Sequence, residues 1–576
     1  MKQLMLGNEA VARGLYEAGC EFVSSYPGTP STEVTEAAAK YKEIYAEWAP
    51  NEKVSMESAF GASLAGHRSF CGMKHVGLNV AADPLFTLSY TGVNAGMVIC
   101  VADDPGMHSS QNEQDSRHYA LAAKVPMLEP SDSAEALSFT KLAYELSEKY
   151  DTPVIIKMCT RVAHSQSVVE TAERVEYAKE YTKDIAKYVM MPANAKKRHP
   201  IVEERTAKLA EYAETAEINT VETGKNNEMG FITSSTSYQY IKEVFGDKYP
   251  VMKLGMIWPL PTESIKKFAA LVDKLVVVEE LDSFIETHCK NIGVSCIGKE
   301  KFSLIDELSQ GKVAQAMGIS TEKGVELGEA IPPRPPVMCA GCPHRGLFYT
   351  LKKNKLNVLG DIGCYTLGAV APLSALDSTI CMGASVSGLH GFCKSSKGQM
   401  DGNSVAVIGD STFMHSGITG LVNIAYNQSN STVIIVDNSI TGMTGHQHNP
   451  TTGFNLKGEA AAKVDLEALC RAVGINRVRV VDPYNLGECD RVIKEELKAA
   501  EPSVIISRRP CALLKNVKHA GPLSVDSEKC KGCGACMQIG CPAISMENGV
   551  VKIDSTQCTG CSVCKQLCRF DVFKEV

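Results

Sequence analysis

Residues 530–568 read CKGCGACMQIGCPAISMENGVVKIDSTQCTGCSVCKQLC. Eight cysteines stand here in two runs, Cys-x2-Cys-x2-Cys-x4-Cys and Cys-x2-Cys-x2-Cys-x3-Cys, and the second run repeats the first after 28 residues. Short spacers place three thiols of each run on one tight loop, and the intervening glycines let the backbone turn around a compact group. Thiolates are soft, anionic ligands, so this array predicts bound metal.

The double run resembles the bacterial-type ferredoxin module, which holds two [4Fe–4S] clusters. Two zinc knuckles are the alternative, but zinc sites pair Cys-x2-Cys couples and do not use triplets. The resemblance implies that residues 521–576 form a small α+β electron-transfer domain. In the module the last cysteine of each run crosses to the other cluster. The resemblance implies one cluster on Cys530, Cys533, Cys536 and Cys568, and a second on Cys541, Cys558, Cys561 and Cys564.

The length, the charge and the apolar pattern of the chain exclude some classes of protein. A chain of 576 residues forms several domains, and a net charge of −7 gives no sign of nucleic-acid or membrane binding. The N-terminus lacks the basic and apolar regions of a signal peptide, and no run of about 18 apolar residues predicts a membrane span. The cysteines outside the tail are scattered, often in apolar runs, as expected of reduced thiols. We therefore expect a cytoplasmic protein.

Short apolar runs separated by helical patterns predict parallel sheets buried on both faces, as in MVICVADD (97–104) and TPVIIKMC (152–159). Residues 166–228 are dense in Glu, Lys and Ala, which predicts a helical connector, and the prolines of 331–337 predict a stiff linker. The expected domains are α/β domains over 1–165, 229–330 and 338–515, joined by the connector and the linker and followed by the tail over 521–576.

Two predicted strands end in side chains that suit a hard cation. Asp410 follows SVAVIG, and Asn438 ends STVIIVDN. Their oxygens, with the backbone carbonyl of Ile440, can supply three ligands of an Mg²⁺ octahedron, and a diphosphate can complete it. The N–H of Ser411, at a helix start, would point at that diphosphate. The alternative is that Asp410 and Asn438 are ordinary turn or cap residues.

This arrangement resembles the thiamine diphosphate signature, a Gly-Asp-Gly motif followed by Asn-Asn. Gly409 and Asp410 match the first motif and Asn438 the second, whereas Ser411 and Asp437 depart from it. Enzymes of that class also need a carboxylate that protonates the aminopyrimidine ring.

Glu52 resembles this carboxylate, because it leads a small-residue helix with Gly61 nine residues later. Glu57 is the competitor. The alternative for Glu52 is a helix-capping carboxylate without a catalytic role.

Taken together, these stretches resemble the 2-oxoacid:ferredoxin oxidoreductases, and most closely the alpha subunits of the indolepyruvate branch. The resemblance covers nearly the whole chain. It implies a multidomain thiamine diphosphate-binding fold in which 1–165 binds the pyrimidine, 229–330 is transketolase-C-like and 338–515 binds the diphosphate. The matching motifs are SYPGTPSTE, MKHVGLNVAADPL, VADDPGMHSSQNEQDSR, CAGCPHRGLFYTLK, GDIGCYTLG and VDNSITGMTGHQ.

The family's motifs also carry over to individual residues. Thr29 corresponds to a substrate-contacting threonine, although it could instead cap a helix that starts at Ser31. His75 and Asn79 are candidates for the substrate pocket, although a histidine in such a stretch is more often structural. These three residues form the predicted substrate site.

Further matches concern the cofactor. Cys339 and Cys342 resemble an element that lines the cofactor pocket, with half a zinc site as the alternative. His344, beside them, is a candidate for proton transfer. Gly442 and Thr444 are expected to shape the loop around diphosphate and metal.

The resemblance implies oxidative decarboxylation of an aryl pyruvate such as indolepyruvate to an acyl-coenzyme A and carbon dioxide. Electrons would pass through the tail clusters to an external ferredoxin, and a smaller beta subunit would complete the enzyme. One alternative is the same chemistry on pyruvate or a branched-chain 2-oxoacid. Another is a non-catalytic electron-transfer subunit.

Overall fold

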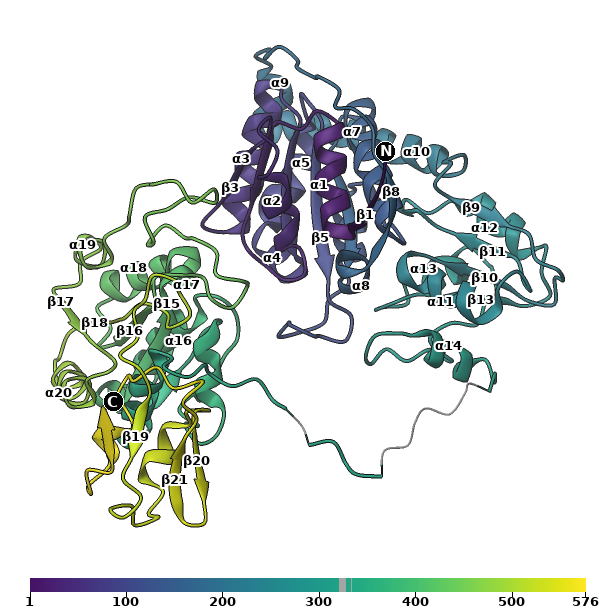
Figure 1. Ribbon diagram of the computed structural model, residues 1–576. Helices are drawn as coiled ribbons and strands as arrows, with labels where there is room; N and C mark the ends of the chain where they lie inside the picture. The colour runs from purple at the N-terminus through teal and green to yellow at the C-terminus, as the bar shows by residue number, and fades with distance from the viewer. Residues whose placement is uncertain (321–327, 333, 576) are drawn as a thin grey trace. The chain divides into compact units, whose positions relative to one another are not determined.

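The computed structural model describes residues 1–320, 328–332 and 334–575. The chain divides into two compact units, Met1–Glu326 and Leu327–Val576, and each is described by itself (Figure 1). The predicted linker over 331–337 includes Pro333, which lies outside the described residues.

The first unit is built on a seven-stranded sheet with the order β12-β6-β7-β5-β4-β2-β3. Neighbouring strands run parallel, except that β12 runs antiparallel to β6. The central strands β5 and β7 are buried at every position, because helices cover both faces and continuous apolar runs are required there. The strands are β2 (Phe22–Ser25), β3 (Tyr45–Trp48), β4 (Ser69–Lys74), β5 (Met97–Asp103), β6 (Met127–Leu128), β7 (Val154–Cys159) and β12 (Met256–Trp258).

Helix α3 (Glu52–Ala65) packs against β2 and β4 and places the predicted carboxylate. It begins at Glu52 because the Asn51 side chain caps it, accepting the Val54 N–H at 2.9 Å. It ends at Gly66, whose φ of 102° is readily available only to glycine. The other helices around the sheet are α1 (Gly7–Glu17), α2 (Thr32–Ala38), α4 (His75–Val80), α5 (Ala82–Thr91), α6 (Arg117–Ala123), α7 (Ser133–Tyr150) and α8 (Thr160–His164).

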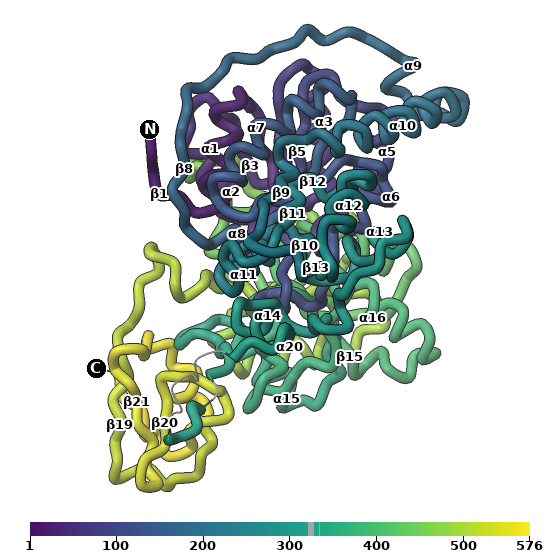
Figure 2. Tube along the Cα trace, turned by 90° about the vertical axis from the view of Figure 1, so that its right-hand side faces the viewer, coloured from purple at the N-terminus to yellow at the C-terminus, as the bar shows by residue number. Residues whose placement is uncertain are grey.

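The second part of this unit has a four-stranded sheet with the order β13-β10-β11-β9 (Figure 2). It differs from the domain predicted over 229–330 in two ways. Its edge strand β9 lies before that range, and β12 leaves it to join the larger sheet. Both parts also share one apolar core, in which Ile232, Leu254 and Phe268 pack with Met56 and Ile99. Its remaining elements are β9 (Thr220–Glu222), β10 (Gly230–Thr233), β11 (Val251–Lys253), β13 (Leu275–Val278), α11 (Ser235–Phe245), α12 (Thr262–Ala269), α13 (Phe284–Asn291) and α14 (Gln310–Ala316).

The connector predicted over 166–228 is helical only in α9 (Ile185–Tyr188) and α10 (Pro192–Ala213). Its first residues form β8 (Gln166–Glu170), which pairs antiparallel with β1 (Lys2–Leu6), so strand pairing overrides the helical composition there. Among the described residues no helix is both long and apolar enough to cross a membrane.

The second unit contains a five-stranded parallel sheet with the order β14-β15-β16-β18-β17. Apolar side chains from β15, β16 and β18 enter two separate clusters, one on each face of the sheet. The predicted strands at 404–410 and 431–438 are confirmed by β15 (Ser404–Gly409) and β16 (Thr432–Asp437), and β18 (Ser503–Arg508) pairs with β16. The other elements are β14 (Asn357–Leu359), β17 (Arg477–Val481), α15 (His344–Lys353), α16 (Ala384–Ser395), α17 (Asp410–Thr412), α18 (Ile418–Tyr426), α19 (Leu466–Ala472) and α20 (Leu486–Leu497).

The cysteine-rich tail adds two antiparallel strand pairs, β19 (Leu523–Val525) with β22 (Phe573–Glu575) and β20 (Ile544–Glu547) with β21 (Val550–Ile553). It packs on the rest of the second unit, where Gln566 donates to the carbonyl of Tyr484 at 2.7 Å. Position 532 requires glycine, because a Cβ there would lie 2.6 Å from the carbonyl oxygen of Gly549.

Candidate functional site

The ends of β15 and β16 bring Asp410 and Asn438 to one edge of the second unit's sheet. The strands are parallel neighbours with Gly409 opposite Val436, so the residues that follow each strand lie close together. Asp410 is buried and accepts hydrogen bonds from Thr451 Oγ1 at 2.9 Å and Asn449 Nδ2 at 3.4 Å. Burial, reinforced by the charge of Asp437, raises the pKa of Asp410 to about 7. A buried carboxyl with neutral partners fits a bound cation, which would replace the proton.

The loop after β16 supplies the neighbouring oxygens. Asn438 Oδ1 accepts the N–H of Ile440 at 3.3 Å, and Ser439 between them has a φ of 60°. Asp437, where the thiamine motif has asparagine, binds Arg508 Nε at 2.8 Å. The departure at Asp437 therefore has its own partner on the adjacent strand β18.

Ser411 lies in the first turn of the helix that follows β15. The turn α17 continues through a π-helical turn, Phe413–Gly417, into α18, so the chain coils without a break to Tyr426. The first N–H groups of such a helix lack partners within it and suit a phosphate. Gly409 precedes them, and a Cβ there would lie 2.7 Å from the Tyr365 ring.

Gly442 and Thr444 lie in the loop that faces this edge. Thr444 Oγ1 donates to Gln447 Oε1 at 2.6 Å, and Gln447 returns a bond to the Thr444 carbonyl. A Cβ on Gly442 would lie 3.4 Å from Cys364 Sγ and 3.9 Å from Asn438 Nδ2. The loop therefore passes between the candidate metal edge and a cysteine.

His344 opens helix α15 and lies against the same edge. Its Nε2 is 3.5 Å from Nδ2 of Asn438, and its ring meets Tyr365 edge-on at 6.0 Å. Burial lowers the pKa of His344 to about 4, so the imidazole is neutral at neutral pH. It can accept a proton there without carrying a charge beforehand.

Four cysteines of the second unit form a group that the sequence analysis did not assemble. Cys339 and Cys342 belong to the predicted Cys-x2-Cys, and the structure adds Cys364 and Cys511. Burial raises the pKa of Cys364 to about 11, and the thiols of Cys511 and Cys339 act in the same direction. Cys342 adjoins Cys339, whose carbonyl accepts the Cys342 N–H at 3.1 Å.

This group adjoins the sheet edge at Asp410 and Asn438. The N–H of Cys511 donates to the carbonyl of Asn438 at 2.9 Å, and Cys364 faces Gly442. Cys364 and Cys511 stand alone in the sequence, so no spacing identified them. The only signals are the place of Cys364 in GDIGC, which belongs to a motif of the family resemblance, and the place of Cys511 shortly after the apolar run that forms β18.

The tail cysteines surround two cavities. The first is lined by Cys541, Cys558, Cys561 and Cys564, together with Cys342 and Arg345 from outside the tail. The second is lined by Cys530, Cys533, Cys536 and Cys568. Each cavity therefore receives three cysteines of one run and the last cysteine of the other.

The spacing of these thiols bears on the metal. A tetrahedral zinc with Zn–S bonds of about 2.3 Å holds its sulfurs roughly 3.8 Å apart. Within residues 1–320, 328–332 and 334–575, three potential ligand atoms come within 4.8 Å of one another only at Asp115, His118 and Asp282. Among the residues that the structure describes, no three cysteine thiols are therefore spaced as tightly as a closed zinc site requires.

In the first unit, the environments of Glu52 and Glu57 differ. Glu52 is buried, and a Cβ on Gly77 would lie 2.6 Å from its Oε1, so its carboxylate lies against the first turn of α4. Glu57 is exposed and pairs with Lys53 on the surface. Only Glu52 occupies a site from which water is excluded.

Thr29 lies in the turn after β2 and does not cap α2, because the N-cap residue is Ser31. The capping alternative for Thr29 was therefore wrong. Lys74 runs alongside this turn, 3.3 Å from the Cβ position of Gly28, and donates to the carbonyl of Ser109 at 2.8 Å. Burial lowers the pKa of Lys74 to about 8.

His75 and Asn79 both belong to α4 but differ in burial. His75 is fully buried, and its Nε2 lies 3.1 Å from the carbonyl of Asn112, while Nδ1 has no partner among the described residues. Asn79 is exposed and accepts from the Tyr119 hydroxyl. Of the two pocket candidates, only His75 is therefore shielded from water.

The polar loop at 102–119 is partly a buried ion-pair network. Arg117 is fully buried and binds Asp115, Glu279 Oε2 at 2.6 Å and the carbonyl of Glu280 at 2.8 Å. Burial would raise the pKa of Asp115, but Arg117 outweighs it and holds that pKa at about 2.

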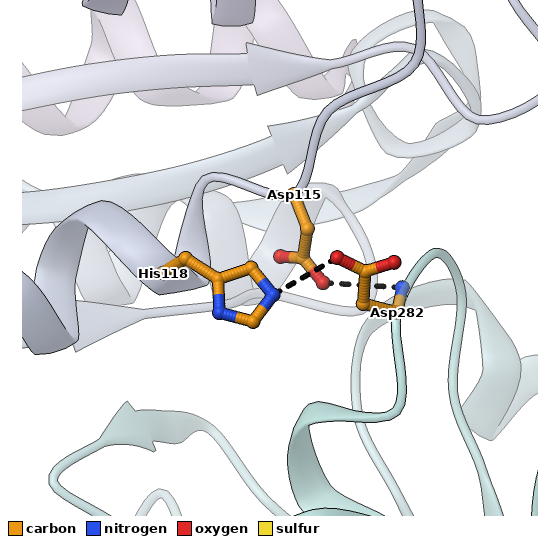
Figure 3. Close-up of side chains that lie close together, drawn as sticks. All are labelled: Asp115, His118 and Asp282. Atoms are coloured by element: carbon orange, nitrogen blue, oxygen red, sulfur yellow. Dashed lines mark hydrogen bonds and ion pairs between the residues drawn. The ribbon is translucent and has the colours of Figure 1, made fainter.

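Asp115 also lies near His118 and Asp282 (Figure 3). Since Arg117 already neutralises it, this trio is better explained as a join between the two parts of the first unit than as a metal site.

Comparisons with protein families match three segments. A model of the thiamine diphosphate-binding part of pyruvate flavodoxin/ferredoxin oxidoreductases matches residues 13–229. A model of the C-terminal binding domain of thiamine pyrophosphate enzymes matches 361–507, and a 4Fe-4S dicluster model matches 522–569. The predicted fold class is confirmed by these matches and by the parallel sheets.

Individual relatives match over greater lengths. Indolepyruvate oxidoreductase subunit IorA of Archaeoglobus fulgidus is 40% identical over 94% of this chain and 92% of its own. The IorA subunit of Pyrococcus horikoshii is 38% identical over 100% of this chain and 97% of its own. Ketoisovalerate oxidoreductase subunit VorB of Methanothermobacter marburgensis is 24% identical over 46% of this chain and 83% of its own.

Proposed function

Because this chain belongs to the family of the IorA subunits of indolepyruvate oxidoreductases, we propose that its substrate is an aryl pyruvate such as indolepyruvate. The chain is an oxidoreductase that uses thiamine diphosphate to oxidise a 2-oxoacid and passes the electrons to ferredoxin. In the proposed balance, the 2-oxoacid, coenzyme A and two oxidised ferredoxins give acyl-coenzyme A, carbon dioxide, two reduced ferredoxins and a proton. The aryl substrate is favoured over a branched one because the IorA relatives are 40% and 38% identical to this chain, whereas the ketoisovalerate relative is 24% identical.

The observation that carries the proposal is the buried edge at Asp410 and Asn438. We assign Mg²⁺ to Asp410, Asn438 Oδ1 and the carbonyl of Ile440, and the diphosphate to the helix start at Ser411. The cofactor, when bound, serves as the electron sink for decarboxylation. The raised pKa of Asp410 supports the metal, because a neutral carboxyl in the metal-free protein would ionise on binding it.

Glu52 is proposed as the carboxylate that exchanges a proton with the aminopyrimidine ring. Its burial against Gly77 keeps water away from that proton. His344, neutral beside Asn438, is proposed for proton transfer on the diphosphate side. Thr29, His75 and Asn79 remain the candidates for contacts with the substrate.

The cysteine groups are proposed as an electron path with three [4Fe–4S] clusters. The group Cys339, Cys342, Cys364 and Cys511 adjoins the diphosphate edge, and Cys342 also lines the cavity of Cys541, Cys558, Cys561 and Cys564. The group Cys530, Cys533, Cys536 and Cys568 would then be the exit toward ferredoxin.

Two partners are proposed. One is a smaller beta subunit, which the subunit names of the relatives support, and the other is an external ferredoxin. The low-potential clusters would work in a reducing cytoplasm.

Substrate preference is tested with the purified complex and a viologen as electron acceptor. We expect indolepyruvate and phenylpyruvate to be oxidised with a much higher kcat/KM than pyruvate or 2-oxoisovalerate. A preference for pyruvate would contradict the aryl assignment. Turnover of none of them, with thiamine and iron bound, would favour a non-catalytic electron-transfer subunit.

A further inference from the structure

Arg345 lies between two of the cysteine groups and is itself buried, with 4% of its surface exposed. It follows the Cys-x2-Cys pair in the first turn of α15. Together with Cys342 it lines the cavity that Cys541, Cys558, Cys561 and Cys564 surround.

The guanidinium binds the backbone directly beside metal-ligand candidates in both groups. On one side, it donates to the carbonyls of Met338 and of Cys339, the latter through Nε at 3.1 Å. On the other side, Nη1 donates to the carbonyl of Ile539 at 3.2 Å and to that of Gly540, the residue before Cys541. One side chain thus ties the two cysteine-bearing segments together.

No carboxylate of the described residues forms an ion pair with Arg345. The cysteines Cys342, Cys541 and Cys561 line the same cavity as Arg345. An unpaired buried charge is costly, because it loses its hydration without an opposite charge nearby. Thiolates and the clusters they hold would supply that opposite charge.

We propose that Arg345 is the positive charge that sets the reduction potentials of the two clusters beside it. The inference rests on the proposed iron–sulfur path and adds a residue to it. Each one-electron reduction adds a negative charge to a cluster, and a fixed cation in a low-dielectric interior stabilises the reduced form more than the oxidised form. Arg345 therefore makes both neighbouring clusters easier to reduce, while its four carbonyl contacts hold them at a fixed separation.

The test is a reductive titration of the purified complex, followed by electron paramagnetic resonance, with iron and sulfide determined on each sample. Arg345→Gln removes the charge, and Arg345→Lys retains it with fewer donors. Arg569→Gln is the matched control, because Arg569 is exposed beside Cys568 and water screens its charge.

We expect Arg345→Gln to lower the reduction potentials of the two neighbouring clusters by at least about 59 mV. For one electron this is a tenfold change in the equilibrium constant of reduction. Arg345→Lys should shift them much less, and Arg569→Gln should leave all potentials near those of the wild type. Loss of iron from Arg345→Gln but not from Arg345→Lys would also support a role of the charge.

Full iron content with unchanged potentials in Arg345→Gln would overturn the proposal. Equal iron loss in the lysine and glutamine variants would likewise overturn it, because shape and hydrogen bonding would then suffice. A wild-type complex without the cluster at Cys339 would contradict the proposed path, as its iron count would show. In that case the shift would be confined to the cluster of Cys541.

Discussion

Glu52 and Glu57 are five residues apart on one helix and differ in burial. If Glu52 exchanges the proton with the cofactor, Glu52→Gln should lower kcat by about 10²–10⁴-fold, since general acid–base groups contribute that much. The iron–sulfur spectrum should be unchanged, because the substitution keeps the shape of the side chain. The measurement is viologen reduction by the loaded complex.

Glu57→Gln is the matched control. It removes an exposed carboxylate that pairs only with Lys53 at the surface, so activity should stay within about twofold. Full activity in the Glu52 variant would remove Glu52 from the site and leave Glu57 as the alternative.

Metal binding at Asp410 should depend on pH around neutrality. The pKa of Asp410 in the metal-free fold is about 7, against an ordinary 3.8, so the folded protein keeps its proton up to neutral pH. A cation must displace this proton, and its apparent affinity should fall about tenfold for each pH unit below 7 and level off above it.

The same shift affects stability. A raised folded-state pKa favours the metal-free fold at acid pH, and this contribution is lost as the pH rises from 3.8 through 7. Added Mg²⁺ and thiamine diphosphate should therefore raise the Tm more at pH 8 than at pH 6. Asp410→Asn should abolish the difference; persistence of the difference would show that another group titrates.

At this scale the sequence predicted single side chains better than their partners. It located Asp410 and Asn438 because strand-end residues follow recognisable apolar runs. It could not find Thr451 or Asn449, whose contacts with Asp410 depend on a loop some 40 residues away. It also missed Cys364 and Cys511, because only the fold brings isolated cysteines to one place.

Arg117 connects two elements, the start of α6 and the end of β13. Arg117→Met should lower the free energy of unfolding of the first unit by about 3–5 kcal/mol, because it leaves Asp115 and Glu279 buried without a counter-charge. The measurement is thermal or denaturant unfolding of the complex.

Arg479→Met is the control for Arg117. Arg479 makes only exposed or long ion pairs, so its loss should cost about 0–1 kcal/mol. Equal effects of the two substitutions would show that the Arg117 network adds no stability.

Elements with continuous apolar runs were predicted well, because burial on both faces leaves little choice of residue. The runs at 97–104 and 152–159 became β5 and β7. The region 166–228 was predicted less well, since its composition favours helix while part of it pairs with the N-terminal strand. Pairing between distant segments leaves no local pattern to read.

For the whole molecule, the iron content tests the three-cluster path. We expect about twelve irons per chain, four for each cysteine group. Cys364→Ser should lower the count to about eight and leave the tail clusters visible in their spectra. Cys381→Ser changes an exposed cysteine outside the three groups and should leave the count unchanged.

A wild-type count near eight would restrict the clusters to the tail. In that case the group of Cys339 would be a structural set of thiols, and Cys364→Ser would leave the iron unchanged.

The family and the class of fold could be predicted for the whole chain because its motifs are distributed along its length. The domain boundaries could not be predicted, because they depend on which elements pack into the same apolar core. Ile232 and Met56 belong to different predicted domains and pack in one cluster.

Strand β12 has a consequence for anyone who wishes to recombine these parts. It is encoded within the second part of the first unit but completes the sheet of the first part, beside β6. A chimera cut near residue 229 would carry a foreign strand into that sheet or leave β6 as a bare edge, which invites aggregation. The segment 1–320 should therefore be exchanged between relatives as one piece, and attempts to graft a new specificity should respect that limit.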